Sequence, residues 1–320
     1  MKIVFSDIQT LGYKMDLRKL EKLGELKVFD NLSDEALREA ISDADILITN
    51  QNRLHVSNLQ LADNLKLICQ AGTGYNNIDI SYCRERGIAV TNVPDYATIS
   101  VAQHTFSMLF YLLSHSRYYD DYVKTGKYSS SFNLHWGRDF YELEGKTWGI
   151  IGMGKIGKKV AEYASGFNCN VIYYSTTGKN HGHMFNSVSL EQLLRASDIV
   201  SIHAPLNENT RNLIGLREIK LMKKSAILLN LGRGGIIAES DLAEALSQDI
   251  IFAAGLDVLE KEPMSENHSL NIKKIYNRIF VTPHIAYASV EARERLMNTI
   301  CDNIISFCGG GRKNRVESII

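Results

Sequence analysis

The chain has 320 residues, which predicts two domains at ~100–200 residues per domain. Apolar residues make up 45% and charged residues 22%, the profile of an ordinary globular protein. The 36 Lys and Arg residues balance the 36 Asp and Glu residues. We therefore expect no electrostatic attraction to nucleic acid and none to an anionic membrane surface.

No segment predicts export or a membrane span. The opening run MKIVFSD is too short for a signal peptide, and the apolar stretch 98–114 contains Gln103 and His104, which favours a buried helix. The cysteines are odd in number and lack zinc-like CxxC spacing, as is typical of free thiols in a reducing compartment. They are Cys69, Cys83, Cys169, Cys301 and Cys308. We expect a cytoplasmic protein.

Short apolar runs, rich in β-branched residues, predict the strands. The first set is 2–5, 45–49, 66–69 and 88–91, and the second is 147–151, 170–174, 198–203, 226–231, 252–256 and 279–282. Runs that are apolar throughout are typical of strands buried on both faces, and helical patterns separate them. The sequence predicts an α/β fold with two Rossmann-like or flavodoxin-like domains, each built on a parallel sheet.

Some helices between these strands have recognisable starts. Ser33 and Ser189 each precede a helical pattern and suit the N-cap position. The segment 117–141 is aromatic and polar without a strong period, so an extended arm, a surface loop and a subunit contact all stay open. The run Gly309–Gly311 predicts a break before a polar tail.

A glycine-rich motif follows the predicted strand 147–151. It reads Gly152-Met153-Gly154-Lys155-Ile156-Gly157 and leads into a helical pattern. Gly152 permits a tight turn, Gly154 lets the backbone approach a pyrophosphate, and Gly157 lets the helix pack on the strand. The N–H groups and dipole of the helix start then favour phosphate. This context predicts a dinucleotide-binding site.

The end of the next predicted strand bears on the choice of cofactor. NAD-binding folds commonly place an Asp or Glu there for the ribose hydroxyls, but this chain has Ser175 followed by Thr176. Hydroxyl groups and Lys179 favour a 2′-phosphate as much as a free ribose. Both NAD(H) and NADP(H) stay open. His181 and His183 follow, but no Cys or carboxylate cluster accompanies them, so we expect no metal site.

Three later segments each place a reactive side chain after a predicted strand. Arg233 suits a carboxylate, which a guanidinium grips with two hydrogen bonds. His284 suits proton donation to a ketone oxygen, and Glu262 suits a hydrogen bond to the far nitrogen of that ring, favouring its protonated form. With hydride from the cofactor, these three residues predict reduction of a 2-keto acid.

With these motifs in place, the chain resembles the D-isomer-specific 2-hydroxyacid dehydrogenase family over essentially its whole length. The resemblance rests on 152–157, 203–206 with Thr210, 230–235, 255–262 and 282–286. It implies that Arg233, Glu262 and His284 are the catalytic set. It also implies a substrate-binding domain of residues 1–98 and 290–320, a cofactor-binding domain of residues 99–289, and an active site in the cleft between them.

The resemblance also implies further binding residues. Thr73 and Gly74 belong to the loop that presents backbone N–H groups to the substrate carboxylate, beside Arg233 and His284. Asp257 matches the residue that bonds the nicotinamide carboxamide. The other implied cofactor contacts, besides the glycine motif, Lys155, Ile156, Ser175 and Thr176, are Thr98, His203, Pro205, Thr210, Leu231, Arg233 and His284. Members of the family also imply a homodimer.

Within the family, the chain looks most similar to glycerate dehydrogenases, also called hydroxypyruvate reductases. The opening segment 5–12 and the segment 284–293 carry this likeness, and Tyr287 stands where many relatives have Trp. We expect a small substrate such as hydroxypyruvate or glyoxylate. D-lactate or D-2-hydroxyisocaproate dehydrogenase activity is an alternative, and an NAD(H)-binding corepressor or sensor without turnover is an alternative of a different class.

Overall fold

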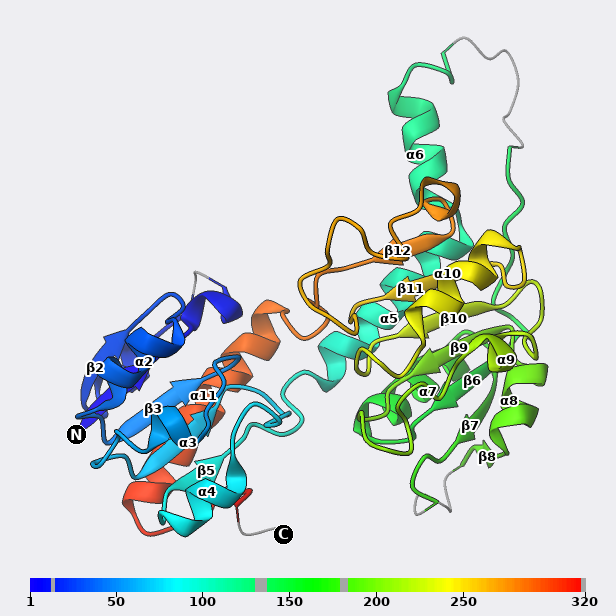
Figure 1. Cartoon of the computed structure of the whole chain (residues 1–320). Coiled ribbons are helices and arrows are strands. Elements are labelled where there is room, and N and C mark those ends of the chain that lie inside the picture. The colour runs from blue at the N-terminus through cyan, green and yellow to red at the C-terminus, as the bar shows by residue number, and fades with distance from the viewer. Residues whose placement is uncertain (13–14, 130–136, 179–183, 318–320) are drawn as a thin grey trace. The chain divides into compact units, whose positions relative to one another are not determined.

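The computed structural model describes residues 1–12, 15–129, 137–178 and 184–317. The chain divides into two compact units, each with its own parallel sheet (Figure 1). Unit 1 comprises Met1–Ala97 and Ala288–Ile320, and unit 2 comprises Thr98–Tyr287. The predicted α/β class, with a parallel sheet in each domain, is confirmed.

Unit 1 is built on a five-stranded parallel sheet of order β2-β1-β3-β4-β5. The strands are β1 Lys2–Phe5, β2 Glu25–Val28, β3 Ile46–Thr49, β4 Leu67–Gln70 and β5 Ala89–Thr91. The helices are α1 Arg18–Glu21, α2 Asp34–Ile41, α3 Val56–Leu59, α4 Ile80–Glu85 and α11 Val290–Cys308, with a 3-10 turn at Ile8–Leu11. α11 packs near β4, so the end of the chain completes this unit.

The local sequence explains these elements. β3 and β4 are buried at every residue, as apolar strands covered on both faces must be. The hydroxyl of Ser33 accepts a hydrogen bond from Ala36 N at 3.3 Å, which confirms Ser33 as the N-cap of α2. The sequence missed β2 because this edge strand is mostly exposed and carries no apolar run.

Unit 2 is built on a seven-stranded parallel sheet of order β12-β11-β10-β9-β6-β7-β8. Its strands are β6 Thr147–Ile151, β7 Asn170–Tyr174, β8 Asn186–Ser187, β9 Ile199–Ile202, β10 Ile227–Asn230, β11 Ala253–Leu256 and β12 Ile279–Val281. Its helices are α5 Thr98–Leu113, α6 Ser116–Lys124, α7 Lys155–Gly166, α8 Leu190–Ala196, α9 Leu216–Ile219 and α10 Glu239–Ser247, with a 3-10 turn at Lys273–Ile275.

The strand order of unit 2 determines where a ligand can bind. β6 pairs with β7 on one side and with β9 on the other, so the winding of the chain reverses beside β6. Ligands bind at such a switch point, outside the carboxyl ends of the strands. Because all the strands are parallel, the residues that follow β6, β7, β9, β10, β11 and β12 meet at this one edge.

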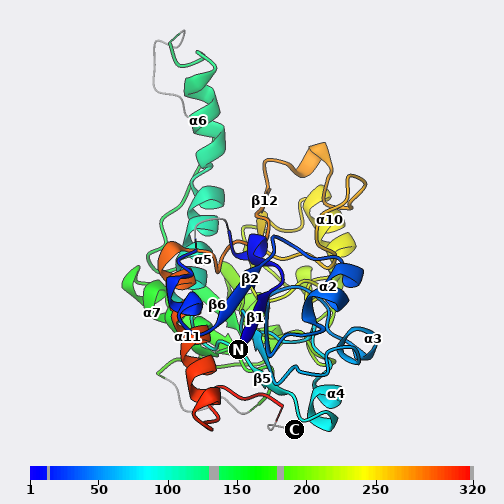
Figure 2. The ribbon, with the colours of Figure 1, turned by 90° about the vertical axis from the view of Figure 1, so that its left-hand side faces the viewer.

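The segment after α5 differs from an irregular arm or loop. Residues Ser116–Lys124 form α6, a helix with no buried residue that projects from the rest of unit 2 (Figures 1 and 2). Ion pairs one turn apart, Arg117 with Asp121 and Lys124 with Asp120, support this exposed helix. Residues 130–136 of the segment lie outside the described residues.

Helix α5 buries one face, as predicted. No helix among the described residues is both long and apolar enough to cross a membrane.

All five cysteines are free, and only Cys308 is exposed. Burial raises the pKa of Cys69 and Cys83 to about 12 and that of Cys169 to about 11.

Candidate active site

The glycine motif forms the turn between β6 and α7. Gly152 has φ +95°, and a Cβ there would lie 2.9 Å from Ala204 N. A Cβ at Gly157 would lie 2.2 Å from Gly152 O, so α7 packs directly on the turn. Gly154 is the N-cap of α7, and a Cβ there would meet nothing within 4 Å. Open space therefore faces a helix N-terminus, which is the arrangement a pyrophosphate requires.

Two buried polar atoms beside this turn have no hydrogen-bond partner. They are Ser175 Oγ, after β7, and His203 Nδ1, after β9. Burial lowers the pKa of His203 to about 3, so its ring is neutral. Unpaired buried polar atoms are costly unless a ligand satisfies them. The strands on either side of β6 thus offer donors and acceptors that fit the ribose hydroxyls or a ribose phosphate.

The other predicted cofactor residues have different positions in unit 2. Thr98 begins α5, and Thr176, Pro205 and Leu231 each lie on the segment that follows a strand. Thr210 is buried, and its hydroxyl donates to Pro205 O at 2.7 Å, so it supports that turn. Lys179, His181 and His183 lie outside the described residues.

The central geometry is a histidine–glutamate pair. His284 Nδ1 lies 2.8 Å from Glu262 Oε2, and both side chains are 36% exposed. Leu259 N donates to the other carboxylate oxygen, Oε1, at 2.9 Å. Nε2 of His284 makes no hydrogen bond within the described part of the chain. The pair therefore leaves Nε2 of the imidazole open to a ligand, while the Glu262 carboxylate holds the ring through Nδ1.

The electrostatics of the pair favour an ionised glutamate. Burial alone would raise the pKa of the Glu262 carboxyl. Hydrogen bonds from His284 and Leu259 N, together with the charges of His284 and Arg233, outweigh burial, so the pKa is lowered. A charged carboxylate behind an imidazole stabilises the proton-carrying ring.

His284 also has an uncommon backbone conformation. Its φ is +53°, in the left-handed region that costs a residue with a side chain about 1–2 kcal/mol. His284 N donates to Asp257 O and to Thr282 O, each at 2.9 Å. The ring of Tyr287 lies edge-on to the imidazole with centroids 5.8 Å apart. The surrounding segment therefore holds the histidine in a conformation that it would not adopt freely.

Arg233 lies on a tight turn after β10. Asn230 holds this turn, accepting from Gly232 N at 3.1 Å and donating to Arg233 O at 2.9 Å. The guanidinium donates to Gly232 O, makes no other hydrogen bond among the described residues and is exposed. Most of its donors are therefore open to a ligand, and binding of a carboxylate stays a prediction.

Asp257 carries more protein hydrogen bonds than the sequence indicated. Its side chain is buried at 2% exposure. The carboxylate accepts from Thr282 Oγ1 at 2.6 Å, from Ile285 N at 2.9 Å and from Ala286 N at 3.0 Å. Asp257 therefore anchors the segment that carries His284, and contact with the nicotinamide stays a prediction.

In unit 1, Thr73 and Gly74 follow β4. The Thr73 hydroxyl donates to Val93 O at 2.9 Å, and Asn92 donates to Thr73 O at 2.8 Å. The backbone N–H groups of Thr73 and Gly74 donate no hydrogen bond within the described residues. Adjacent free N–H groups on a fixed turn suit an anion.

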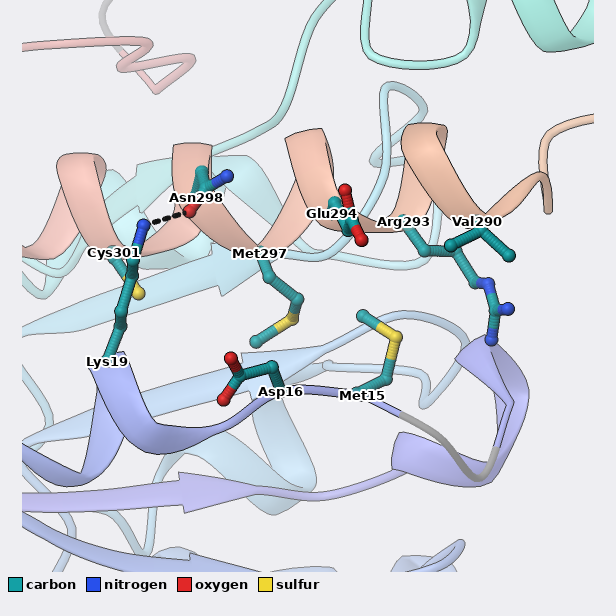
Figure 3. A pocket seen from close by; sticks show the side chains of 9 residues that line it. All are labelled: Met15, Asp16, Lys19, Val290, Arg293, Glu294, Met297, Asn298 and Cys301. Atoms are coloured by element: carbon teal, nitrogen blue, oxygen red, sulfur yellow. Dashed lines mark hydrogen bonds between the residues drawn. The ribbon is translucent and has the colours of Figure 1, made fainter.

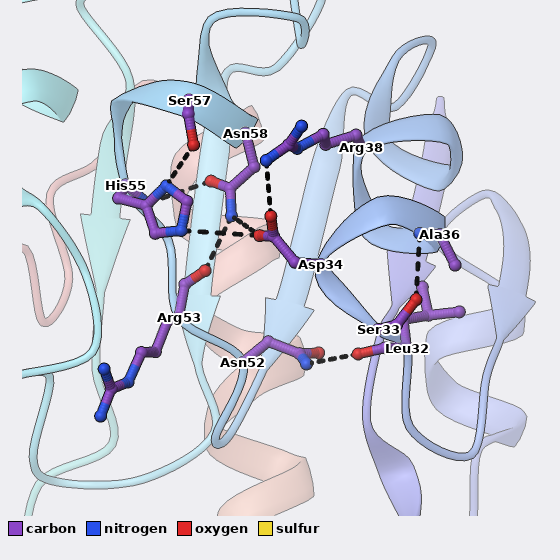
Figure 4. A network of polar contacts seen from close by, with 10 residues as sticks. All are labelled: Leu32, Ser33, Asp34, Ala36, Arg38, Asn52, Arg53, His55, Ser57 and Asn58. Atoms are coloured by element: carbon purple, nitrogen blue, oxygen red, sulfur yellow. Dashed lines mark hydrogen bonds and ion pairs between the residues drawn. The ribbon is translucent and has the colours of Figure 1, made fainter.

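Sequence reasoning missed two supporting networks in unit 1. Buried Asp7 accepts from Thr49 Oγ1 and from the backbone N–H groups of residues 50, 51 and 52, which fixes the loop after β3. Asp34 accepts from Asn58 at 2.9 Å and lies 3.5 Å from His55, joining α2 to α3 (Figure 4). A polar residue just after a buried strand was the signal available for Asp7.

It also missed a second histidine–glutamate pair in unit 2. His268 Nε2 lies 2.8 Å from Glu239 Oε2, with side chains 12% and 8% exposed. Glu260 N donates to Glu239 Oε1 at 2.5 Å, and Leu270 N donates to His268 Nδ1 at 3.2 Å. This buried pair closes the loop that carries Glu262.

Two cavities of unit 1 include none of the predicted catalytic residues. One, of about 240 Å³, lies between α11 and the segment before α1, and is lined by Met15, Lys19, Met297 and Cys301 among others (Figure 3). The other, of about 510 Å³, is lined by 53–55 and 76–79, at the carboxyl ends of β3 and β4. Among the described residues no cluster of His, Cys, Asp and Glu side chains suits a metal ion.

Known proteins resemble this chain over most of its length. Residues 106–286 match the family described as D-isomer specific 2-hydroxyacid dehydrogenase, NAD binding domain. A hydroxypyruvate reductase of Blautia hydrogenotrophica is 35% identical over 99% of this chain and 100% of the relative. A glyoxylate reductase of Aeropyrum pernix is 37% identical over 92% of this chain and 90% of the relative.

A solved structure with bound cofactor shares the fold. The D-lactate dehydrogenase of Aquifex aeolicus, complexed with NAD and lactic acid, superposes with a TM-score of 0.85. It is 27% identical, and the match covers the whole of both chains.

Proposed function

Because the chain belongs to the D-isomer-specific 2-hydroxyacid dehydrogenase family, we propose that it reduces glyoxylate or hydroxypyruvate to the 2-hydroxy acid with NADH or NADPH. The family predicted from the motifs is confirmed, and the chain is an NAD(P)-dependent oxidoreductase. The named substrates are our proposal, supported by the two relatives of 35% and 37% identity that act on them.

One observation supports the chemistry most strongly. At the sheet edge that carries the dinucleotide motif, His284 is hydrogen-bonded to Glu262 through Nδ1, and its Nε2 has no hydrogen-bond partner among the residues that the structure describes. A hydride acceptor that becomes an alkoxide needs a proton donor there, and an imidazolium backed by a carboxylate supplies it.

The remaining residues take roles that follow from their chemistry. A reduced nicotinamide, when bound, supplies the hydride. His284 holds the proton at Nε2 for the keto oxygen, and Glu262 orients the ring. Arg233 is the cation for the substrate carboxylate. The free N–H groups of Thr73 and Gly74 in unit 1 are a second group suited to an anion. Unit 1 with Thr73 is then the substrate-binding domain.

The end of β7 supports use of NADPH as well as NADH. Ser175 Oγ is buried and unpaired, and no carboxylate stands at Ser175, Thr176 or Thr177 to repel a 2′-phosphate. Ser175→Asp should lower kcat/KM with NADPH relative to NADH by ~10–100-fold, since juxtaposed like charges cost several kcal/mol. An unchanged ratio would remove Ser175 from cofactor choice.

The test measures consumption of NADH and of NADPH, separately, with hydroxypyruvate, glyoxylate, pyruvate and 2-ketoisocaproate. We expect the first two acids to be preferred. Preference for pyruvate or 2-ketoisocaproate would retain the chemistry and reject the substrate. Cofactor binding without turnover of any acid would reject the enzyme proposal in favour of a sensor or corepressor. A homodimeric state and a cytoplasmic location stay predictions.

A further inference from the structure

Two side chains of α5 contact the segment that carries His284. Ser100 and His104 lie one helical turn apart, on one face of α5. Ser100 Oγ donates to Ala286 O at 2.6 Å, and His104 Nε2 lies 3.1 Å from Thr282 Oγ1. Residues 282 and 286 flank His284, so α5 holds both ends of this short segment.

The direction of these hydrogen bonds follows from counting protons. Thr282 has one hydroxyl hydrogen, and it donates that hydrogen to Asp257 Oδ1 at 2.6 Å. The contact between Thr282 and His104 therefore requires a proton on His104 Nε2. The chain of donors runs from His104 through Thr282 to the carboxylate of Asp257.

The far end of this chain holds the backbone beside His284. Asp257 Oδ1 also accepts from Ile285 N at 2.9 Å, and Oδ2 accepts from Ala286 N at 3.0 Å. These two N–H groups directly follow His284, whose φ of +53° is unfavourable for a residue with a side chain. The carboxylate thus stabilises a backbone conformation that points the imidazole at Glu262.

We propose that His104 is a positioning residue, which acts through the hydroxyl of Thr282 and the carboxylate of Asp257 to hold His284 in its left-handed conformation against Glu262. This inference rests on the proposed function, because it assigns to His104 an effect on proton transfer. No motif used for the family assignment contains His104.

His104 acts through a hydrogen-bond donor and not through charge. Burial lowers the pKa of His104, and the nearby Asp257 carboxylate, 3.8 Å away, offsets this only in part. The ring is therefore neutral at pH 7, with its proton on Nε2. Any side chain that places an N–H at this point should serve, and one that lacks a donor should not.

The experiment compares four test variants and one control variant with the parent in kcat for glyoxylate reduction. His104→Leu removes the donor, and His104→Gln replaces it with an amide N–H. Thr282→Val removes the relay hydroxyl while keeping the shape of the side chain, and the fourth variant combines His104→Leu with Thr282→Val. Thr105→Val is the matched control, since within the described part of the chain its buried hydroxyl bonds Val101 O of the same helix and no other group.

We expect His104→Leu and Thr282→Val each to lower kcat about tenfold or more, because small displacements of a proton donor are costly. The kcat of the double variant should lie within about threefold of that of the less active single variant, since both substitutions break the same chain of hydrogen bonds. His104→Gln should lie within about threefold of the parent, and Thr105→Val should match the parent. Multiplied losses in the double variant, or equal losses in His104→Gln and His104→Leu, would overturn the proposal.

A second measurement needs no turnover. The imidazole nitrogen signals of His284, assigned by their absence in His284→Ala, should shift in His104→Leu and Thr282→Val but not in Thr105→Val. Unshifted signals would overturn the inference, whatever the activity. If His104→Leu does not fold, an unchanged kcat in Thr282→Val would likewise overturn the proposal. If turnover is lost in His284→Ala but kept in His104→Leu, the proposed function stands and the positioning role of His104 is rejected.

Discussion

The two histidine–glutamate pairs of unit 2 have the same nitrogen–oxygen distance, 2.8 Å, and differ in their surroundings. In the buried pair, both ring nitrogens of His268 and both oxygens of Glu239 are engaged by protein groups. In the other pair, Nε2 of His284 makes no hydrogen bond within the described residues, and a third of each side chain is exposed.

The difference separates a structural contact from a reactive one. Fully satisfied polar groups in a buried place fix a loop and have nothing left to offer a ligand. A pair with one open ring nitrogen keeps its orientation and can exchange a proton. Distance alone would have assigned both pairs the same role, so the unused atom is what indicates function.

The largest effect should come from the open pair. His284→Ala should lower kcat by roughly 10²–10⁴-fold, the usual loss when acid–base catalysis is removed, while cofactor still binds. Stopped-flow single turnovers and cofactor titration by fluorescence would measure both. A kcat near that of the parent would exclude His284 as the proton donor. The two pairs could then no longer be told apart as structural and reactive.

Glu262→Gln should have the next largest effect, a fall in kcat of about 10–100-fold, because the ring loses the carboxylate that orients it. Steady-state kinetics across pH 5–9 would measure it. A loss confined to KM would instead place Glu262 in substrate binding.

The same variant carries a pH signature. The pKa of Glu262 is lower in the folded chain than in an unfolded one, so its contribution to stability is full above about pH 4.3 and is lost as the pH falls through the folded value. The difference in unfolding free energy between parent and Glu262→Gln should therefore shrink below that pH. Urea unfolding at several pH values would measure this, and a difference that grows on acidification would contradict the assignment.

For the buried His268–Glu239 pair we expect the opposite pattern, with a larger effect on stability than on kcat. His268→Ala leaves a buried carboxylate with one donor fewer, and we expect the unfolding free energy to fall by about 1–3 kcal/mol. The effect on kcat should be under tenfold, since within the described residues the His268 ring bonds Glu239 and Leu270 and reaches neither Glu262 nor His284. A larger loss of kcat than of stability would give the buried pair a catalytic role.

The smallest effect is expected from the exposed histidine–aspartate contact of unit 1. His55 lies 3.5 Å from Asp34, and both side chains are nearly half exposed (Figure 4). Solvent screens such a pair, so His55→Gln should leave the melting temperature within experimental error. A clear drop would mean that exposure is a poor guide to the three pairs.

The sequence predicted those features that depend on local pattern. Strands β1, β6 and β7 have the predicted bounds because each is a short apolar run between polar ends. The glycine motif predicted the turn before α7, because its Cβ-free positions determine what can pack there. Glu262 and His284 were expected together because each follows a predicted strand and a carboxylate suits the far nitrogen of the imidazole, and the structure pairs the two strands, β11 and β12.

What the sequence did not predict depends on tertiary contacts. β2 and β8 lie at sheet edges and lack buried runs, so no apolar pattern marks them. The contact between His104 and Thr282 joins residues 178 positions apart, and no motif links them. The left-handed backbone of His284 is likewise held by its neighbours, through the hydrogen bonds from His284 N to Asp257 O and Thr282 O.

The thiols described above have a practical consequence for labelling. Four of the five cysteines are buried, and burial keeps the thiols of Cys69, Cys83 and Cys169 protonated at neutral pH. A maleimide should therefore react only at the exposed Cys308. A single fluorophore can thus be attached to unit 1 at the end of α11 without mutagenesis. Its signal on adding cofactor or keto acid would report whether binding to one unit is sensed by the other.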